Sequence, residues 1–149
     1  MNDFKPFDDK LAGLIAALSP AARRRMAADI AKTLRARQQR RIKTQKAPDG
    51  TPYAARKRQP VKAKKGWVKR EMFAKLRTSR FMKATAGNDS AVVEFTGKVQ
   101  RMANVHQHGL KDKPGRNSAQ VQYDARPLLG FQSDDLAIIE VIIAKGFDI

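Results

Sequence analysis

The two histidines, His106 and His108, are the residues with the clearest capacity for metal or acid–base chemistry. Two positions apart on a helix, their side chains point about 200° from one another, so one ion cannot bind both. The chain has no cysteine, and no nucleophile elbow, phosphate-binding glycine loop or carboxylate cluster accompanies the histidines. We therefore predict satisfied or solvent-exposed histidines, no metal, no catalytic residue and no cofactor, and hence no enzyme.

The adjacent carboxylates Asp134 and Asp135 could in principle form an acid–base pair. They follow Ser133 and precede the apolar run that ends the chain. In that position, Ser133 is expected to cap a helix, and the two carboxylates are expected to complement the positive end of its dipole. The pair therefore predicts a helix start rather than a hydrolase.

The strongest chemical signal is clustered positive charge. Of the 31 Lys and Arg residues, 22 lie between Arg23 and Lys83, opposed only by Asp29, Asp49 and Glu71. Residues 84–149 hold 7 bases and 8 acids. Because screening limits charge interactions to about 8 Å at cellular salt, this zone favours close contact with a polyanion or an acidic protein surface. The residues predicted to make this contact are Arg56, Lys57, Arg58, Lys62, Lys64 and Lys65.

Two interpretations of the basic zone compete with a protein contact. Lysine and arginine on a surface are usually only solvated, but 12 bases against one acid in residues 56–83 exceed what solubility requires. A small nucleic-acid-binding protein is the alternative function. The single Trp67 offers no row of aromatic rings for base stacking. Trp67 and Phe73 are instead expected to anchor the end of the basic segment on the domain.

The first third of the chain predicts two helices and a loop. Apolar spacing indicates an amphipathic helix over residues 8–18, and Ser19-Pro20 begins a second helix. Its apolar stripe fails after Leu34, so the helix is expected to continue, solvated, to about Gln45. Residues 47–70 are predicted to form a mobile basic loop, because Asp-Gly between two prolines stops the helix and no periodicity follows.

The second half predicts a mixture of strands and helices. Residues 80–86 and 91–96 flank Gly87-Asn88-Asp89-Ser90 and indicate a β-hairpin. A short helix over 99–108 ends at Gly109. Residues 110–118 are a polar loop and 119–123 a third strand. The closing helix is expected to bury Leu136, Ile139 and Ile143.

These elements predict one α+β domain over residues 1–149. A small, mostly antiparallel sheet packs against N-terminal and C-terminal helices, with a long basic loop. The three parts are a helical region (8–46), the loop (47–70), and the hairpin, short helix, strand and closing helix (71–149). No run approaches the roughly 18 apolar residues of a membrane span, and Met1 to Asp9 does not resemble a signal peptide. We therefore expect a protein that is made and kept in the cytosol.

Six short segments resemble the phage virion morphogenesis family, the tail completion proteins of contractile-tailed temperate bacteriophages. They occur in the family's order and at similar spacing over nearly the whole chain. The segments are Leu18 to Ala27 (LSPAARRRMA), Gln39 to Arg41 leading into Ala47 to Tyr53 (APDGTPY), Met72 to Thr78 (MFAKLRT), Phe95-Thr96-Gly97, Val105 to Gly109 (VHQHG) and Ala125 to Phe131 (ARPLLGF).

This resemblance implies a structural virion protein at the head-proximal end of the tail, assembled in the host cytoplasm. It implies a tail terminator that forms a homo-oligomeric, hexameric ring and provides the surface for head–tail joining. The implied partners are the tail tube or sheath, neck or connector proteins, and DNA passing through the ring, with no membrane. Arg126 and Pro127 of the last segment are expected to set the turn into the closing helix, with Arg126 paired to Asp124 or Glu94.

Overall fold

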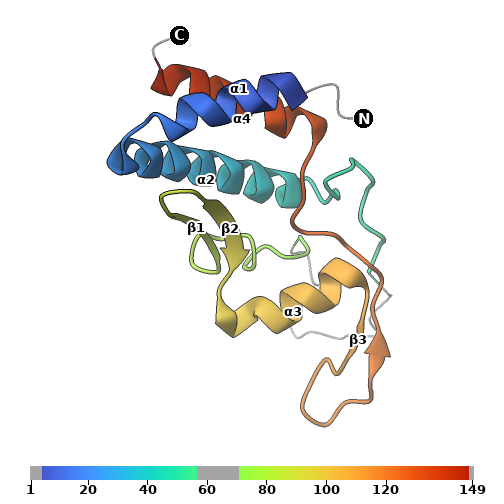
Figure 1. Cartoon of the computed structure of the whole chain (residues 1–149). Helices are drawn as coiled ribbons and strands as arrows, with labels where there is room; N and C mark the ends of the chain where they lie inside the picture. Colours follow the sequence, from blue (N-terminus) through green and yellow to red (C-terminus); the bar gives the residue numbers. More distant parts are fainter. Residues whose placement is uncertain (1–4, 57–70, 148–149) are drawn as a thin grey trace.

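The long helix α2 (Pro20–Lys43) is the element on which the other parts of the protein assemble. A computed structural model describes residues 5–56 and 71–147. In Figure 1, α1 (Lys5–Ala16) and α4 (Ser133–Gly146) lie on one side of α2, and the hairpin of β1 (Met82–Ala86) and β2 (Ala91–Phe95) lies on the other. Helix α3 (Gly97–His108) and the short strands β3 (Lys111–Asp112) and β4 (Val121–Gln122) lie beyond the hairpin. The predicted α+β class is confirmed.

Helix α2 begins as the sequence predicts. The Ser19 hydroxyl accepts a hydrogen bond from the Ala22 N–H at 3.2 Å, and Pro20 occupies the first helical turn, where its missing N–H costs nothing. The helix ends at Lys43, two residues before the predicted end. Its 24 residues give a rod of about 36 Å.

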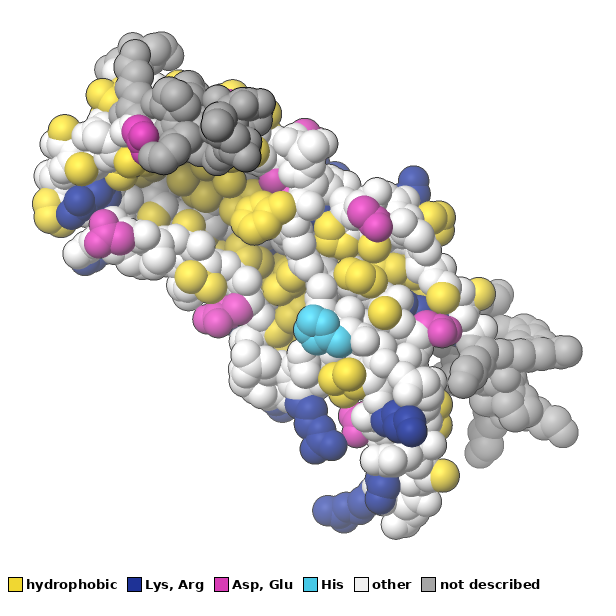
Figure 2. Space-filling model, turned by 45° about the vertical axis from the view of Figure 1, so that its right-hand side comes forward, with side chains coloured by type: hydrophobic (Ala, Val, Ile, Leu, Met, Phe, Trp, Pro, Cys, Tyr) yellow, Lys and Arg dark blue, Asp and Glu magenta, His cyan; other side chains and the backbone are white. Residues whose placement is uncertain are grey.

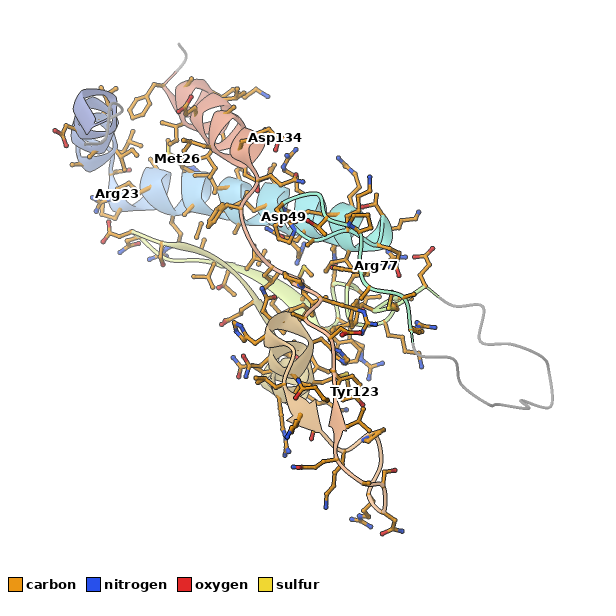
Figure 3. All side chains as sticks on the ribbon, turned by 90° about the vertical axis from the view of Figure 1, so that its right-hand side faces the viewer. Arg23, Met26, Asp49, Arg77, Tyr123 and Asp134 are labelled. Atoms are coloured by element: carbon orange, nitrogen blue, oxygen red, sulfur yellow. The ribbon has the colours of Figure 1, made fainter. Side chains whose placement is uncertain are left out.

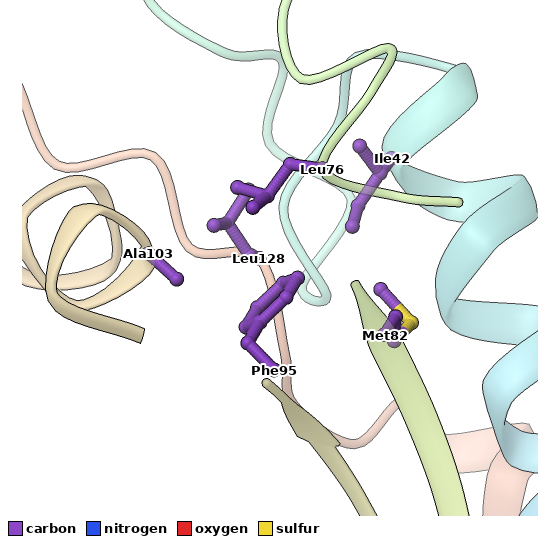
Figure 4. Packing of buried hydrophobic residues seen from close by; sticks show 6 residues of the cluster. All are labelled: Ile42, Leu76, Met82, Phe95, Ala103 and Leu128. Atoms are coloured by element: carbon purple, nitrogen blue, oxygen red, sulfur yellow. The ribbon is translucent and has the colours of Figure 1, made fainter. Parts of the chain in front are cut away.

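The β1–β2 hairpin carries the main apolar core on its face. The strands are antiparallel, with Met82 opposite Phe95 and Ala84 opposite Val93, so the hairpin prediction is confirmed. Met82 is fully buried, and Phe95 is nearly so. Figure 4 shows how residues far apart in sequence meet around them. The cluster consists of Ile42, Leu76, Met82, Phe95, Ala103 and Leu128.

The predicted third strand is shorter than expected and pairs elsewhere. Strand β4 comprises only Val121–Gln122, and it pairs with β3 rather than with the β1–β2 hairpin. The prediction of a continuous polar loop over residues 110–118 is therefore wrong at Lys111–Asp112. The reason is local: the turn through Pro114-Gly115 folds the chain back on itself, so the nearest available partner is the preceding segment.

Gly109 ends α3 as predicted. It adopts a left-handed conformation with φ of 65°, and a Cβ atom there would lie 2.7 Å from the backbone nitrogen of Ala125. Both the conformation and the close approach require glycine. The segment leading to α4 can therefore run directly against the end of α3.

One face of the second half of α2 is buried, so the prediction that this half is solvated is wrong for that face. Gln38 and Arg41 are only 5% and 6% exposed. Both side chains donate hydrogen bonds to the Gly130 carbonyl, at 2.8 Å and 3.2 Å. Polar groups can be buried when partners satisfy them, and here the partners come from a segment almost 90 residues away. Periodicity of apolar residues cannot reveal such a partner.

Helix α4 is attached to α2 by a buried carboxylate. Asp135 is fully buried; it lies 2.6 Å from Nε of Arg37 and 3.8 Å from Nη1 of Arg41. Asp134, largely exposed, lies 2.8 Å from Nη2 of Arg37. These carboxylates raise the pKa of Arg37, whereas burial lowers the pKa of Arg41. The ion pairs therefore join α2 to the first turn of α4.

The same carboxylate also begins the helix. The N-cap is Gln132 rather than the predicted Ser133, and its backbone N–H donates to Asp135 Oδ2 at 2.7 Å. Because Asp135 points inward at α2, Leu136 is turned away by about 100°. Leu136 is consequently 50% exposed, so its predicted burial is wrong, whereas the predicted burial of Ile143 is confirmed.

The first part of the predicted basic loop, residues 47–56, is held by contacts with the domain. Ala47 is buried, a hydrogen bond joins the Ala47 N–H to the Thr51 carbonyl, and Lys46 pairs with Pro52. The prediction of a mobile loop is therefore wrong at Ala47. Residues 57–70, the larger part of the predicted loop, lie outside the described residues.

We predict that Asp135→Asn destabilises the protein by about 3 kcal/mol, because it leaves Arg37 and Arg41 without their buried counter-charge. The neighbouring Asp134→Asn is the matched control and should have a much smaller effect, since that side chain is 64% exposed. Urea unfolding followed by circular dichroism measures both. Equal stabilities for the two variants would contradict a structural role of the buried pair.

Candidate functional site

We call residues 56–70 the cationic segment. The structure describes Arg56 and the residues that flank this segment on both sides. Arg56 is exposed at the first end, and Phe73, Arg126 and Pro127 are also described. The other predicted contact and anchor residues lie outside the described residues: Lys57, Arg58, Lys62, Lys64, Lys65 and Trp67. The described part of the candidate site is the base of this segment, formed by the residues on either side of it.

The two ends of the cationic segment are held together at their base. The rings of Tyr53 and Phe73 meet edge to face, with centroids 5.6 Å apart. The Gln45 side chain donates to the Met72 carbonyl at 2.9 Å and accepts from the Met72 N–H at 3.0 Å. The Gln45 carbonyl also accepts from the Tyr53 N–H at 2.8 Å. One residue at the end of α2 thus ties both ends of the segment.

Two of these residues have an unusual backbone. Gln45 and Phe73 have φ angles of 61° and 65°, in the left-handed region that non-glycine residues seldom occupy. Such conformations cost on the order of 1–3 kcal/mol each and persist where surrounding contacts compensate. Here the compensation comes from the amide pairing with Met72 and from the aromatic contacts of Phe73.

Arg126 binds the chain just before the cationic segment. Its buried guanidinium donates to the carbonyls of Ala54 and Ala55, at 2.9 Å and 3.1 Å. Of the two carboxylates predicted to pair with it, Asp124 lies 3.9 Å away. The main partners are backbone carbonyls, which a sequence motif does not specify. Arg126 therefore fixes the backbone immediately before Arg56.

Pro127 contributes through its carbonyl. That oxygen accepts a hydrogen bond from the Tyr53 hydroxyl at 2.9 Å. Burial raises the pKa of Tyr53 to about 12, so the hydroxyl keeps its proton at physiological pH. Arg126 and Pro127 thus act on the same end of the cationic segment. Their predicted role in setting the turn into α4 stays a prediction.

His106 extends the aromatic contact into the body of the protein. Its ring lies 5.0 Å from Phe73 on one side and 4.9 Å from Tyr123 on the other. Burial lowers its pKa, and the nearby Arg126 cation lowers it further, against a smaller opposing effect of Asp112. The buried Nδ1 atom has no hydrogen-bond partner among the described residues. The ring is therefore held neutral, as a spacer between two aromatic side chains.

His108, by contrast, is exposed. Within residues 5–56 and 71–147, no three His, Asp or Glu side chains lie close enough to hold a metal ion. No helix in this part of the chain is long and apolar enough to cross a membrane. The contacts at the base of the segment are hydrogen bonds, ion pairs and ring packing. They hold and orient the backbone on both sides of the segment.

Sequence reasoning missed the glutamines that organise this region. The Gln107 side chain accepts from the Leu128 and Leu129 N–H groups, at 2.8 Å and 3.0 Å, and donates to the Leu129 carbonyl at 3.0 Å. Gln45 has the same function at Met72. A glutamine between two histidines, or one after an arginine-rich helix, looks like ordinary surface. Their only signal in the sequence is their position relative to the family-like segments. Gln107 lies within Val105 to Gly109, and Gln45 lies just before Ala47 to Tyr53.

The phage virion morphogenesis family model matches residues 2–148. The chain belongs to this family. The tail completion protein S of Escherichia phage P2 is 54% identical to it over 144 residues, which cover 96% of each chain. No solved structure shows significant similarity to the chain. Membership of a virion morphogenesis family, together with this relative, supports a structural role in the phage tail.

The buried His106 makes the packing at the base of the cationic segment sensitive to pH. Its folded-state pKa lies below the ordinary value of 6.5, so the contribution to stability is complete above that value and decreases as the pH falls below it. We predict a lower unfolding free energy at pH 5.5 than at pH 7.5. His106→Gln should have a smaller pH dependence in urea unfolding, and His108→Gln should retain that of the original protein. An unchanged dependence in His106→Gln would contradict the assignment.

Proposed function

We propose that this protein completes a phage tail at its head-proximal end and provides the surface for head–tail joining. It acts as a structural component, a hexameric ring on the tail tube or sheath, and not as an enzyme. The observation that carries the proposal is the 54% identity, over 96% of both chains, to a tail completion protein. A ring that closes a hollow tube must match the rotational symmetry of the tube, because head-to-tail contacts close only at a fixed rotation.

The cationic segment supplies one contact of this ring. Its base is fixed by Tyr53, Phe73 and Gln45, and its first residues by Arg126. Charge held on a fixed base can form charge-assisted hydrogen bonds with carboxylates of the tube, sheath or neck, or with the phosphates of DNA passing through the ring. Residues 57–70 contain no Asp or Glu. The positive charge of the segment is therefore not neutralised from within it and can act on a partner.

We predict that glutamine at all six loop positions leaves the fold intact but lowers the yield of infectious particles by about tenfold or more, since even one lost charge-assisted contact has that effect on affinity. The assay is complementation of a phage that lacks its own copy, scored by plaque titre and by completed tails in negative stain. The substituted positions are Arg56, Lys57, Arg58, Lys62, Lys64 and Lys65.

A second variant, with the same loss of charge elsewhere, is the control. It carries glutamine at six exposed basic positions of the hairpin, α3 and the β3–β4 turn, and it should complement normally. Those positions are Lys83, Lys98, Arg101, Lys111, Lys113 and Arg116. Normal yield from the loop variant would mean that the cationic segment is only solvated.

The alternative function, a small nucleic-acid-binding protein, is favoured by the net charge of +17. It predicts binding of free DNA whose affinity falls steeply with salt, by about one logarithmic unit per neutralised phosphate for each tenfold increase in salt. The tail function predicts a discrete ring without nucleic acid. Mass photometry at two salt concentrations, with and without DNA, separates these functions.

A further inference from the structure

An exposed aromatic ring and two carboxylates lie close together at the start of α4. Phe131 is 74% exposed and borders a shallow depression with Asp49 and Asp134. A hydrogen bond from Thr51 lowers the pKa of Asp49, and Arg37 lowers that of Asp134, so both carboxylates are charged at neutral pH. We call Phe131, Asp49 and Asp134 the acidic knob. An exposed aromatic ring between two carboxylates is unusual on a protein with a net charge of +17.

A groove of opposite charge lies at the other end of α4. It is bounded by α2 and the last turn of α4, has a volume of about 540 Å³, and has an apolar floor of Leu18, Met26 and Ile142. In Figure 2, hydrophobic side chains gather on the surface of this helical layer. The charged residues that line this basic groove are Arg25, Lys32 and Lys145, with Asp29 as the single carboxylate.

The knob cannot reach the groove of its own chain. Asp134 is in the first turn of α4, whereas Ile142 and Lys145 are in its last two turns. The helix rises by roughly 16 Å between Asp134 and Lys145. Figure 3 shows Met26 between α1 and α4, and Asp49 and Asp134 toward the opposite end of the layer. Complementary surfaces at the two ends of α4 favour a contact between copies of the chain.

We propose that the acidic knob of one subunit docks in the basic groove of the next. This inference rests on the ring of the proposed function and identifies its contact surfaces. Phe131 inserts onto the apolar floor, while Asp49 and Asp134 approach Arg25, Lys32 and Lys145. The contact is heterologous, because the knob of one subunit binds the groove, a different surface, of the next. Such contacts form a closed ring when the rotation between neighbouring subunits divides a full turn evenly. A central aromatic side chain with a charged rim is the usual composition of an interface hot spot.

The first test is the assembly of Phe131→Ala, measured by mass photometry across a concentration series. We expect a loss of ring affinity of about 30-fold or more, the scale of an interface hot spot, with unchanged circular dichroism and melting temperature. Met102→Ala is the matched control, since Met102 is also an exposed apolar residue, 53% exposed, but lies on α3. A Phe131→Ala protein that assembles as well as the Met102→Ala protein would overturn the proposal.

The second test uses the absence of cysteine in the natural chain. Proteins carrying Ser133→Cys, which is exposed next to Asp134 and leaves Phe131 in place, and Ala22→Cys, at the edge of the groove, are mixed and oxidised. A disulfide forms only where the two Cα atoms come within about 7 Å, so the proposal predicts a cross-linked heterodimer on non-reducing gels. A protein carrying both substitutions should give a ladder that stops at the ring number. Replacing Ala22→Cys by Met102→Cys should abolish the cross-link.

Two other outcomes would count against the docking of knob in groove. Rapid dimers of Ser133→Cys alone would mean a two-fold contact through the knob. The wild-type protein could form a ring while the cysteine variants fail to cross-link and Phe131→Ala assembles normally. Other surfaces would then form the ring, and the proposed tail function would stand. Wild-type protein that stays monomeric, alone and on purified tails, would overturn both the docking and the ring of the proposed function.

Discussion

The structure depends on one buried interaction, the carboxylate of Asp135 held by the guanidinium groups of Arg37 and Arg41. A buried charge is tolerated only when its partners are close and well oriented. Here α2 supplies the cations, and the N–H of Gln132 supplies a further donor, so one side chain begins α4 and attaches it to α2. Arg41 also binds the Gly130 carbonyl, which draws the segment before α4 onto the same helix. The order of the helical layer therefore follows from polar bonds as much as from apolar burial.

The basic residues of this protein fall into two groups. The interior uses some of the basic residues of α2 as structural partners, whereas residues 57–70 have seven bases and no acid of their own. Gln45, Tyr53, Phe73 and Arg126 keep both ends of that segment close to α3. A fixed base reduces the conformational freedom that a charged chain loses on binding, and so favours binding to an acidic partner. Such binding fits the structural role in the phage tail that the family supports.

Several elements could be predicted because their signals are local. Ser19-Pro20 begins α2, Gly109 ends α3, and the alternation around Val93 and Phe95 forms the hairpin with its turn at Gly87–Ser90. Each of these depends on residues within a few positions of one another. The N-cap of α4, by contrast, lies one residue before the predicted Ser133. Asp135 accepts a hydrogen bond from the Gln132 N–H and is held in place by Arg37 and Arg41, which are far away in the sequence. The same interaction turned Leu136 outward and made its predicted burial wrong.

The sequence by itself determined the α+β class, most element positions, the concentration of positive charge and, through six ordered segments, the family. Tertiary structure alone decided which charges are structural: Arg41 and Arg126 are buried against partners and Arg37 is partly buried, while Arg56 is exposed. It also placed the acidic knob and the basic groove at opposite ends of α4. The physical reason is that charge and periodicity are properties of neighbouring residues, whereas burial of a polar group depends on a partner that only the folded chain brings within bonding distance.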